Sequence, residues 1–121
     1  MYKVRIDKEK NRLYLSANEI YRREAKEFAE LIERECKKLK PGFTCITDLR
    51  GQKRQIGKID RIICDVQTLL ANAGMKKVVR VVNPKSADIE LQFEAISVLN
   101  VGYSAYTTTN MKIAEEILDQ P

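Results

Sequence analysis

The order of helix-like and strand-like segments constrains this fold more than any other feature. Apolar residues recur at helical spacing over 25–39 and again over 59–73, and each stretch is followed by a short run typical of a β-strand, at 43–48 and 77–82. Parallel neighbours in a sheet need a crossover connection, which is usually a helix. The pattern therefore predicts an α/β domain with a mostly parallel sheet.

The first residues predict an antiparallel hairpin. Tyr2, Val4 and Ile6 alternate with charged residues, and after a polar turn the alternation resumes at Leu13 and Leu15. A period of two with charged residues between the apolar ones is typical of strands that have one solvated face. The first strand is therefore expected to run antiparallel at one edge of the sheet.

Capping residues suggest where the first two helices begin and end. Ser16 and Glu19 have the spacing of a capping box ahead of the first helix, and Asn18 is a competing cap. Gly74 follows the second apolar stripe and is expected to end that helix.

The last third of the chain adds one more strand and two more helices. Ser86 can cap a third helix, a short strand is expected over 103–107, and either Thr109 or Asn110 can cap a closing helix near 111–120. The complete expected order is ββαβαβαβα, which gives a five-stranded, mostly parallel sheet.

Composition limits the class of protein. A chain of 121 residues suits a single domain, 1–121, and no apolar run approaches the ~20 residues of a bilayer span. The N-terminus shows no export signal, so we expect a cytoplasmic protein. Histidine is absent, and Cys36, Cys45 and Cys64 each lie among apolar residues, so we expect buried, reduced thiols and neither a metal nor a cofactor.

A basic loop follows the strand at 43–48 and is the first candidate for a functional site. The strand ends at Asp48, and the next ten residues contain Arg50, Lys53, Arg54 and Lys58 without an acid. Ligands of open parallel sheets bind beyond the carboxyl ends of the strands, and the following helix N-terminus favours negative charge. The loop is interpreted as an anion or partner site, or alternatively as a solvated loop whose charges keep the protein soluble.

Neutral polar residues follow the later strands and should reach the same edge of the sheet. Asn83, Ser86 and Thr108 could donate hydrogen bonds to a ligand held by Arg50 or Arg54. The alternative is that Ser86 is a helix cap and that Asn83 belongs to a turn before a proline. Asp48 could act as a base, but no histidine or second carboxylate lies near it in sequence, so pairing with Arg50 is the expected role.

The opening hairpin, the helix, and a strand that ends in Asp48-Leu49-Arg50-Gly51 resemble the STAS family, named after sulfate transporters and anti-sigma factor antagonists. The likeness is closest to its single-domain bacterial members. The resemblance implies a sheet edged by helices and a regulatory role through protein binding. Antagonists of the family carry a phosphorylated Ser or Thr near the start of the helix after this junction, whereas residues 49–67 of this chain contain neither. A related group is implicated in binding lipids or other apolar ligands.

The sequence therefore predicts a non-enzymatic binding or regulatory module that engages an acidic or phosphorylated protein through the loop 50–58. The alternative is a small molecule or lipid bound in a cavity between helices and sheet. Arg80 interrupts the valines of a central strand, and the opening strands are one-sided, so one sheet face is expected to be partly uncovered and could form a homodimer. No nucleic-acid motif is recognisable, and nucleic acid is not an expected partner.

Overall fold

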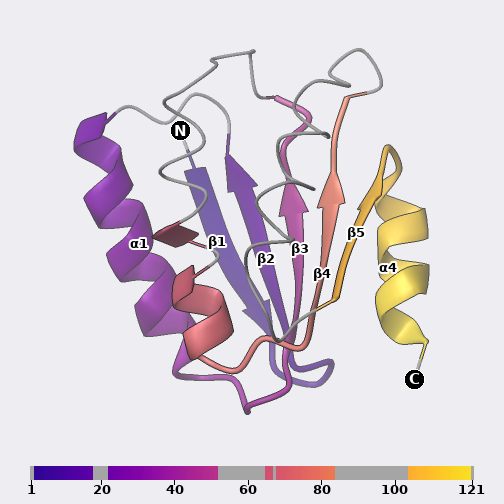
Figure 1. Ribbon diagram of the computed structural model, residues 1–121, viewed down its shortest axis with the longest axis horizontal. Helices are drawn as coiled ribbons and strands as arrows, with labels where there is room; N and C mark the ends of the chain where they lie inside the picture. The colour runs from indigo at the N-terminus through magenta and orange to yellow at the C-terminus, as the bar shows by residue number, and fades with distance from the viewer. Residues whose placement is uncertain (1, 18–21, 52–64, 67, 84–103, 121) are drawn as a thin grey trace.

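The computed structural model describes residues 2–17, 22–51, 65–66, 68–83 and 104–120 (Figure 1). Its five strands form one sheet in the order of the sequence, with β1 antiparallel to β2 and every later pair parallel. This confirms the predicted α/β class and mixed sheet. The strands are β1 (Tyr2–Asp7), β2 (Arg12–Ala17), β3 (Thr44–Asp48), β4 (Lys77–Val81) and β5 (Ser104–Thr108).

The hairpin between β1 and β2 closes through a short polar turn. Asp7 Oδ1 accepts a hydrogen bond from the backbone N–H of Lys10 at 3.2 Å. Asn11 has a φ of 52°, in the left-handed region that asparagine tolerates better than most residues. The turn aligns Asp7 with Arg12 and so sets the register of the whole hairpin.

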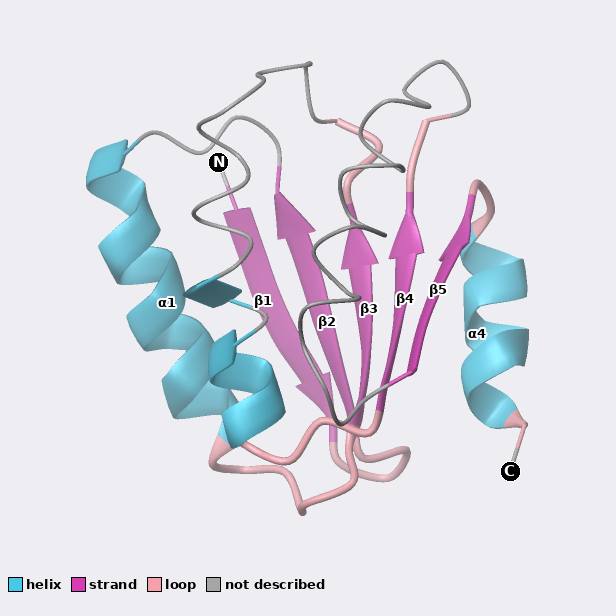
Figure 2. Cartoon of the chain, in the orientation of Figure 1, coloured by secondary structure: helices cyan, strands magenta, loops and turns pink. Residues whose placement is uncertain are grey.

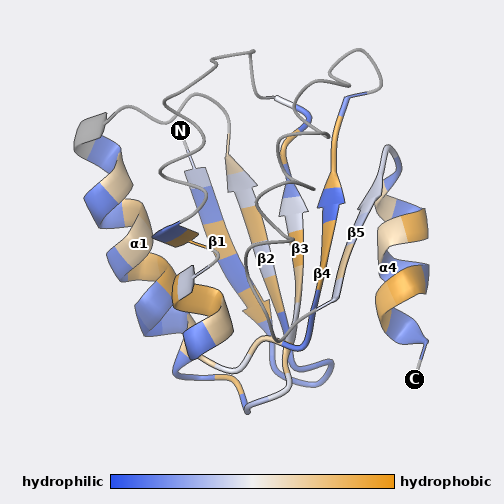
Figure 3. Cartoon of the chain, in the orientation of Figure 1, coloured by the Kyte–Doolittle hydropathy of each residue, from blue (hydrophilic) through white to orange (hydrophobic). Residues whose placement is uncertain are grey.

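The sheet has two faces with separate apolar clusters. On the α1 face, β-strand residues such as Leu13, Cys45 and Val78 pack with Phe28 and Ile32 of α1 (Arg22–Cys36). The other face, the α4 face, is covered by the closing helix α4 (Met111–Asp119), which packs mainly against β4 and also against β3 and β5. Figure 3 shows the apolar side of α1 turned toward the sheet.

Ser16 is not a helix cap, which corrects the sequence-based expectation. It lies inside β2, where it pairs with Lys3 of β1 and with Asp48 of β3. A residue with a strand on both sides gains two ladders of backbone hydrogen bonds, and a local cap offers less. The competing cap, Asn18, and its neighbour Glu19 lie outside the described residues.

Gly74 ends the second helix as predicted. Residues 65–66 and 68–72 are helical, and Gly74 then adopts a φ of +103° (Figure 2). A Cβ at this position would lie 3.2 Å from Pro41 Cα, so both conformation and space favour glycine. The beginning of that expected helix lies outside the described residues, as does the whole helix expected after Ser86.

Of the two caps considered for the closing helix, Asn110 is the one observed, and its side chain accepts a hydrogen bond from the backbone N–H of Lys112 at 2.8 Å. Cys36 and Cys45 are free and buried, and burial raises the pKa of the Cys45 thiol to about 12. Cys64 lies outside the described residues. No helix in the described part of the chain is both long and apolar enough to cross a membrane.

Arg80 lies on the α1 face and is buried, so it does not mark an uncovered surface. Its neighbours on β3 and β5 are Thr47 and Thr107, so these three polar residues lie side by side across the otherwise largely apolar α1 face. Among the described elements, α4 leaves a different part of the sheet open, on the α4 face over β1 and β2.

Candidate functional site

The carboxyl ends of β3, β4 and β5 bring several predicted site residues to one edge of the sheet. The register aligns Asp48 with Val81 and Val81 with Thr108, and Asn83 follows two residues after Val81. We call Asp48, Arg50, Asn83 and Thr108 the carboxyl rim. The other predicted site residues, Lys53, Arg54, Lys58 and Ser86, lie outside the described residues.

Asp48 and Arg50 form a bidentate ion pair at this rim. Arg50 Nε donates to Asp48 Oδ1 at 2.9 Å, and Arg50 Nη2 donates to Asp48 Oδ2 at 2.8 Å. The Arg50 backbone N–H also donates to Oδ1 at 3.1 Å. These hydrogen bonds from Arg50 hold the pKa of Asp48 below its usual value. Asp48 therefore orients Arg50, which is the pairing that the sequence favoured.

The paired guanidinium remains accessible. Asp48 occupies the Nε and Nη2 side of Arg50, while the side chain of Arg50 is 48% exposed. A guanidinium has five N–H donors in one plane, so Arg50 can accept a second anion without releasing Asp48.

A hollow of about 410 Å³ lies beside this ion pair, on the part of the α4 face that α4 leaves open. We call it the sheet hollow. Two rows of neighbouring strand residues form its floor and outer side, namely Lys3, Ser16 and Asp48 in one row and Arg5, Tyr14 and Ile46 in the next. Met111, the first residue of α4, lies at its other side.

Two exposed cations of β1 flank the hollow. The Arg5 guanidinium lies 3.7 Å from the centroid of the Tyr14 ring, which holds its planar group flat over the floor. Lys3 is also exposed and lies one row closer to Asp48. Neither residue was among the site residues predicted from the sequence. The sequence feature that could have identified them is the alternation of Lys3 and Arg5 with apolar residues, because it places both on the side of β1 away from α1.

A buried arginine links α4 to β2. Arg12 Nη1 contacts Glu115 Oε1 at 3.0 Å and Arg12 Nη2 contacts Asp119 Oδ1 at 2.9 Å, while the Arg12 side chain is only 3% exposed. Its Nε donates to Thr44 Oγ1 at 3.1 Å. These contacts hold the C-terminal half of α4 near the start of β2, and α4 leaves the opposite end of β1 and β2 open.

Glu115 is the centre of this anchor. Burial raises the pKa of its carboxyl, but hydrogen bonds from Tyr14, Arg12 and Lys10 outweigh that effect and lower the pKa below its usual value. The Tyr14 hydroxyl donates to Glu115 Oε1 at 2.7 Å. Tyr14 therefore both lines the sheet hollow and holds α4 through its hydrogen bond to Glu115.

A second hollow, of about 670 Å³, lies on the opposite side of the molecule between α1 and the helical residues 65–66 and 68–72. Glu33, Lys37, Asp65 and Asn72 line it together with apolar residues such as Leu69. It is open at the surface and lies between helices. The predicted cavity between helices and sheet remains a prediction, because residues 52–64 and 84–103 lie outside the described part of the chain.

The described groups are suited to holding an anion. Arg50, Arg5 and Lys3 supply exposed positive charge, and the carboxylate of Asp48 is already occupied by Arg50. In the described residues, no three His, Cys, Asp or Glu side chains are placed to hold a metal ion.

The chain was compared with models of protein families, with curated proteins and with solved structures, and none of the three comparisons found a match.

Proposed function

We propose that this protein is a non-enzymatic binding and regulatory module that engages an acidic or phosphorylated protein partner. The binding surface consists of the carboxyl rim, the sheet hollow beside it and the basic loop 50–58 that begins at Arg50. The partner's carboxylates or phosphates contact the cations of this surface, and an adjoining apolar side chain enters the hollow.

The strongest support for this proposal is that three exposed cations from two distant segments lie near one corner of the sheet. Lys3 and Arg5 come from β1, and Arg50 follows β3. Only β2 separates Lys3 from Asp48, so the two lie about 10 Å apart at the usual spacing of strands. Such a cluster around an apolar floor matches a partner with clustered negative charge.

The stacking of Arg5 on Tyr14 favours a protein over a nucleic acid as the partner. Proteins that bind single strands use open aromatic faces on which bases stack. Here the accessible side of the Tyr14 ring is covered by Arg5. The arginine instead offers its N–H edge, which suits the bidentate binding of a carboxylate or phosphate.

A STAS-like identity is part of the proposal. What supports it is the opening hairpin, the parallel strands that follow it, and the Asp48-Leu49-Arg50-Gly51 junction after β3. Because residues 49–67 contain no hydroxyl side chain, any control by phosphorylation at that junction acts through the partner's phosphate.

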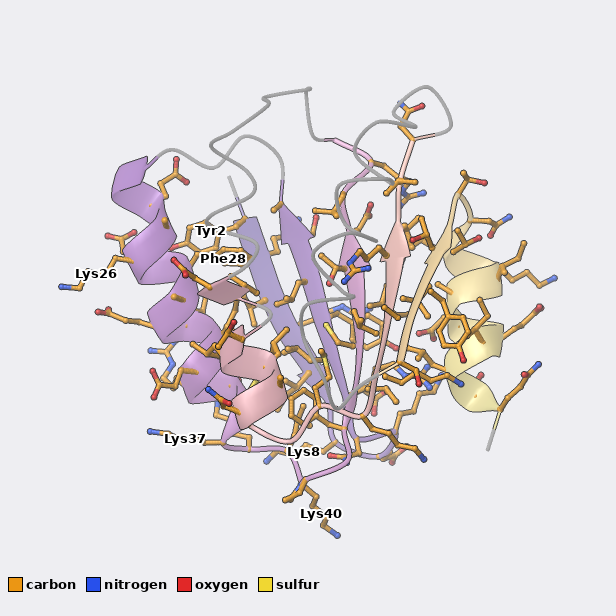
Figure 4. All side chains as sticks on the ribbon, viewed as in Figure 1. Tyr2, Lys8, Lys26, Phe28, Lys37 and Lys40 are labelled. Atoms are coloured by element: carbon orange, nitrogen blue, oxygen red, sulfur yellow. The ribbon has the colours of Figure 1, made fainter. Side chains whose placement is uncertain are left out.

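The test is affinity capture from a lysate with three forms of the protein. The site variant carries Lys3→Gln, Arg5→Gln and Arg50→Gln. The control variant carries Lys26→Gln, Lys37→Gln and Lys40→Gln, which removes the same charge from exposed side chains that point away from the sheet (Figure 4). Bound proteins are identified and quantified by mass spectrometry.

We expect the wild type and the control variant to recover the same acidic or phosphorylated protein and the site variant to lose it. Treating the lysate with phosphatase distinguishes the two kinds of charge, because only a phosphorylated partner would then be lost. Equal recovery by both variants would overturn the proposal.

A further inference from the structure

The two edges of the sheet are built differently, and β5 is the edge without charge. Its sequence from Ser104 to Thr108 contains no charged residue and no proline. In the described part of the chain, the two large hydrophobic side chains that are exposed are Tyr106 on β5, at 43%, and Ile113 on α4, at 45%. An edge of β-forming residues without charges can pair with another strand, because charges usually protect an edge from this.

The hydrogen bonds to β4 show which backbone groups face the open edge. The Ser104 N–H donates to Lys76 O at 3.1 Å, and Thr108 O accepts from the Val82 N–H at 2.9 Å. The N–H and C=O of one strand residue point to the same side, and the sides alternate along the strand. Ala105 and Thr107 therefore point their N–H and C=O groups away from β4, where the described residues add no further strand.

We propose that β5 pairs antiparallel with β5 of a second copy of this chain, with Tyr106 at the twofold axis. In this register Ala105 exchanges both backbone hydrogen bonds with Thr107 of the partner subunit, and Thr107 does the same with the partner's Ala105. Tyr106 then faces the partner's Tyr106 in a non-hydrogen-bonded pair, the position at which opposing side chains lie closest. Aromatic pairs at such positions stabilise antiparallel strands.

Charge makes β5 a better edge than β1 for pairing with a second copy. When two copies pair around a twofold axis, each residue lies opposite the same residue of the other copy or one close to it in sequence. At β1 the same operation would bring Lys3 and Arg5 close to their own copies, and like charges opposite each other are destabilising. No residue of β5 itself carries a charge that pairing would oppose. The homodimer expected through a partly uncovered sheet face stays a prediction; on the α4 face it would bring the Lys3 and Arg5 side chains of the two copies together.

Helix α4 adds apolar surface on the same side. Glu115 and Asp119 face Arg12 on β2, and Ile113 is two residues before Glu115, so it lies about 200° around the helix, on the side of β5. Lys77 Nζ, which lies 5.2 Å from the centroid of the Tyr106 ring, also donates to Ile117 O at 3.0 Å, which places this side of α4 near Tyr106. In the proposed dimer the two Ile113 side chains lie on the same face of the joined sheet as the two tyrosines.

The test is sedimentation equilibrium of the whole chain over about a hundredfold range of concentration, because a weak dimer forms by mass action. Tyr106→Lys sets two positive charges against each other at the axis, and Tyr106→Phe is its matched control. Thr107→Pro removes an N–H that points to the open edge, a position at which a strand tolerates proline, and Thr107→Val is its control.

We expect the wild type, Tyr106→Phe and Thr107→Val to form dimers, and Tyr106→Lys to raise the dimer dissociation constant by about tenfold or more. Thermal unfolding monitors whether each variant folds, and Tyr106→Lys alone decides the question if Thr107→Pro does not fold. A wild type that stays monomeric at every concentration would overturn the proposal. So would Tyr106→Lys dimers as stable as those of the wild type.

Discussion

The two edge strands of this sheet have opposite chemistry although both belong to one small domain. β1 alternates strongly between apolar and charged residues, whereas β5 is uniformly intermediate in hydropathy (Figure 3). The apolar residues of β1 face α1, and its exposed cations flank the sheet hollow. We infer from this difference that the charges of β1 both protect that edge from pairing and provide a surface for an oppositely charged partner, whereas β5, which lacks such charges, is suited to pairing with its own copy.

The position of α4 maintains this asymmetry, and Arg12 is the residue that determines it. We expect Arg12→Met to lower the free energy of unfolding by about 2–3 kcal/mol, because the change leaves the half-buried Glu115 without its main cation. Urea denaturation measures the loss. The control is Arg34→Met, since Arg34 is exposed on α1. Equal stability of the two variants would show that Arg12 does not anchor α4.

Removing the charges of β1 should make that edge behave like β5. We expect Lys3→Thr with Arg5→Thr to strengthen self-association about tenfold when it is introduced into the Tyr106→Lys variant, whose β5 edge is blocked. Sedimentation equilibrium measures the change. The matched control is Lys26→Thr with Lys37→Thr in the same Tyr106→Lys background, which should leave self-association unchanged. If the β1 variant also leaves it unchanged, charge is not what protects that edge.

Acid should weaken the contact between α4 and β2. The pKa of Glu115 is lowered in the folded protein, so its contribution is present above the unfolded value of about 4.3 and is lost as the pH falls through the folded value. We expect Glu115→Gln to reduce the loss of stability between neutral pH and about pH 3.5, measured by urea denaturation at each pH. An acid profile identical to that of the wild type would contradict this role.

The smallest effect is expected at the carboxyl rim. We expect Arg50→Gln to change the free energy of unfolding by about 0.5 kcal/mol or less, because the pair with Asp48 is exposed and screened by solvent. The same variant should clearly weaken capture of an acidic partner. A large loss of stability would instead make Arg50 a structural residue.

Local patterns predicted most of the described fold. The hairpin, α1, β3 and the cap at Asn110 depend on periodicity and on neighbours within a few residues. Ser16 was misassigned because strand pairing with Lys3 and Asp48 outweighed its capping pattern, and those partners are distant in sequence. The periodicity of apolar residues predicted that α1 forms, but it did not show that β2 extends through Ser16, the residue expected to cap that helix.

The candidate site was only partly predictable. Asp48 and Arg50 were identifiable because they are two residues apart and follow a strand. The sheet hollow was not, because it exists where α4 does not reach, and that limit depends on the contact of Arg12 with Glu115 across a large sequence separation. The edge position of β5 likewise follows from the order of the strands in the sheet.

The most direct test of the account is an NMR titration of the ¹⁵N-labelled protein with hexaglutamate. We predict saturable shifts of the amide signals of β1 and of residues 48–51, with no saturable shift at residues 104–108. Shifts spread equally over the exposed lysines of α1 and of the segment after it, or centred on β5, would contradict the claim that the two edges of the sheet serve different partners.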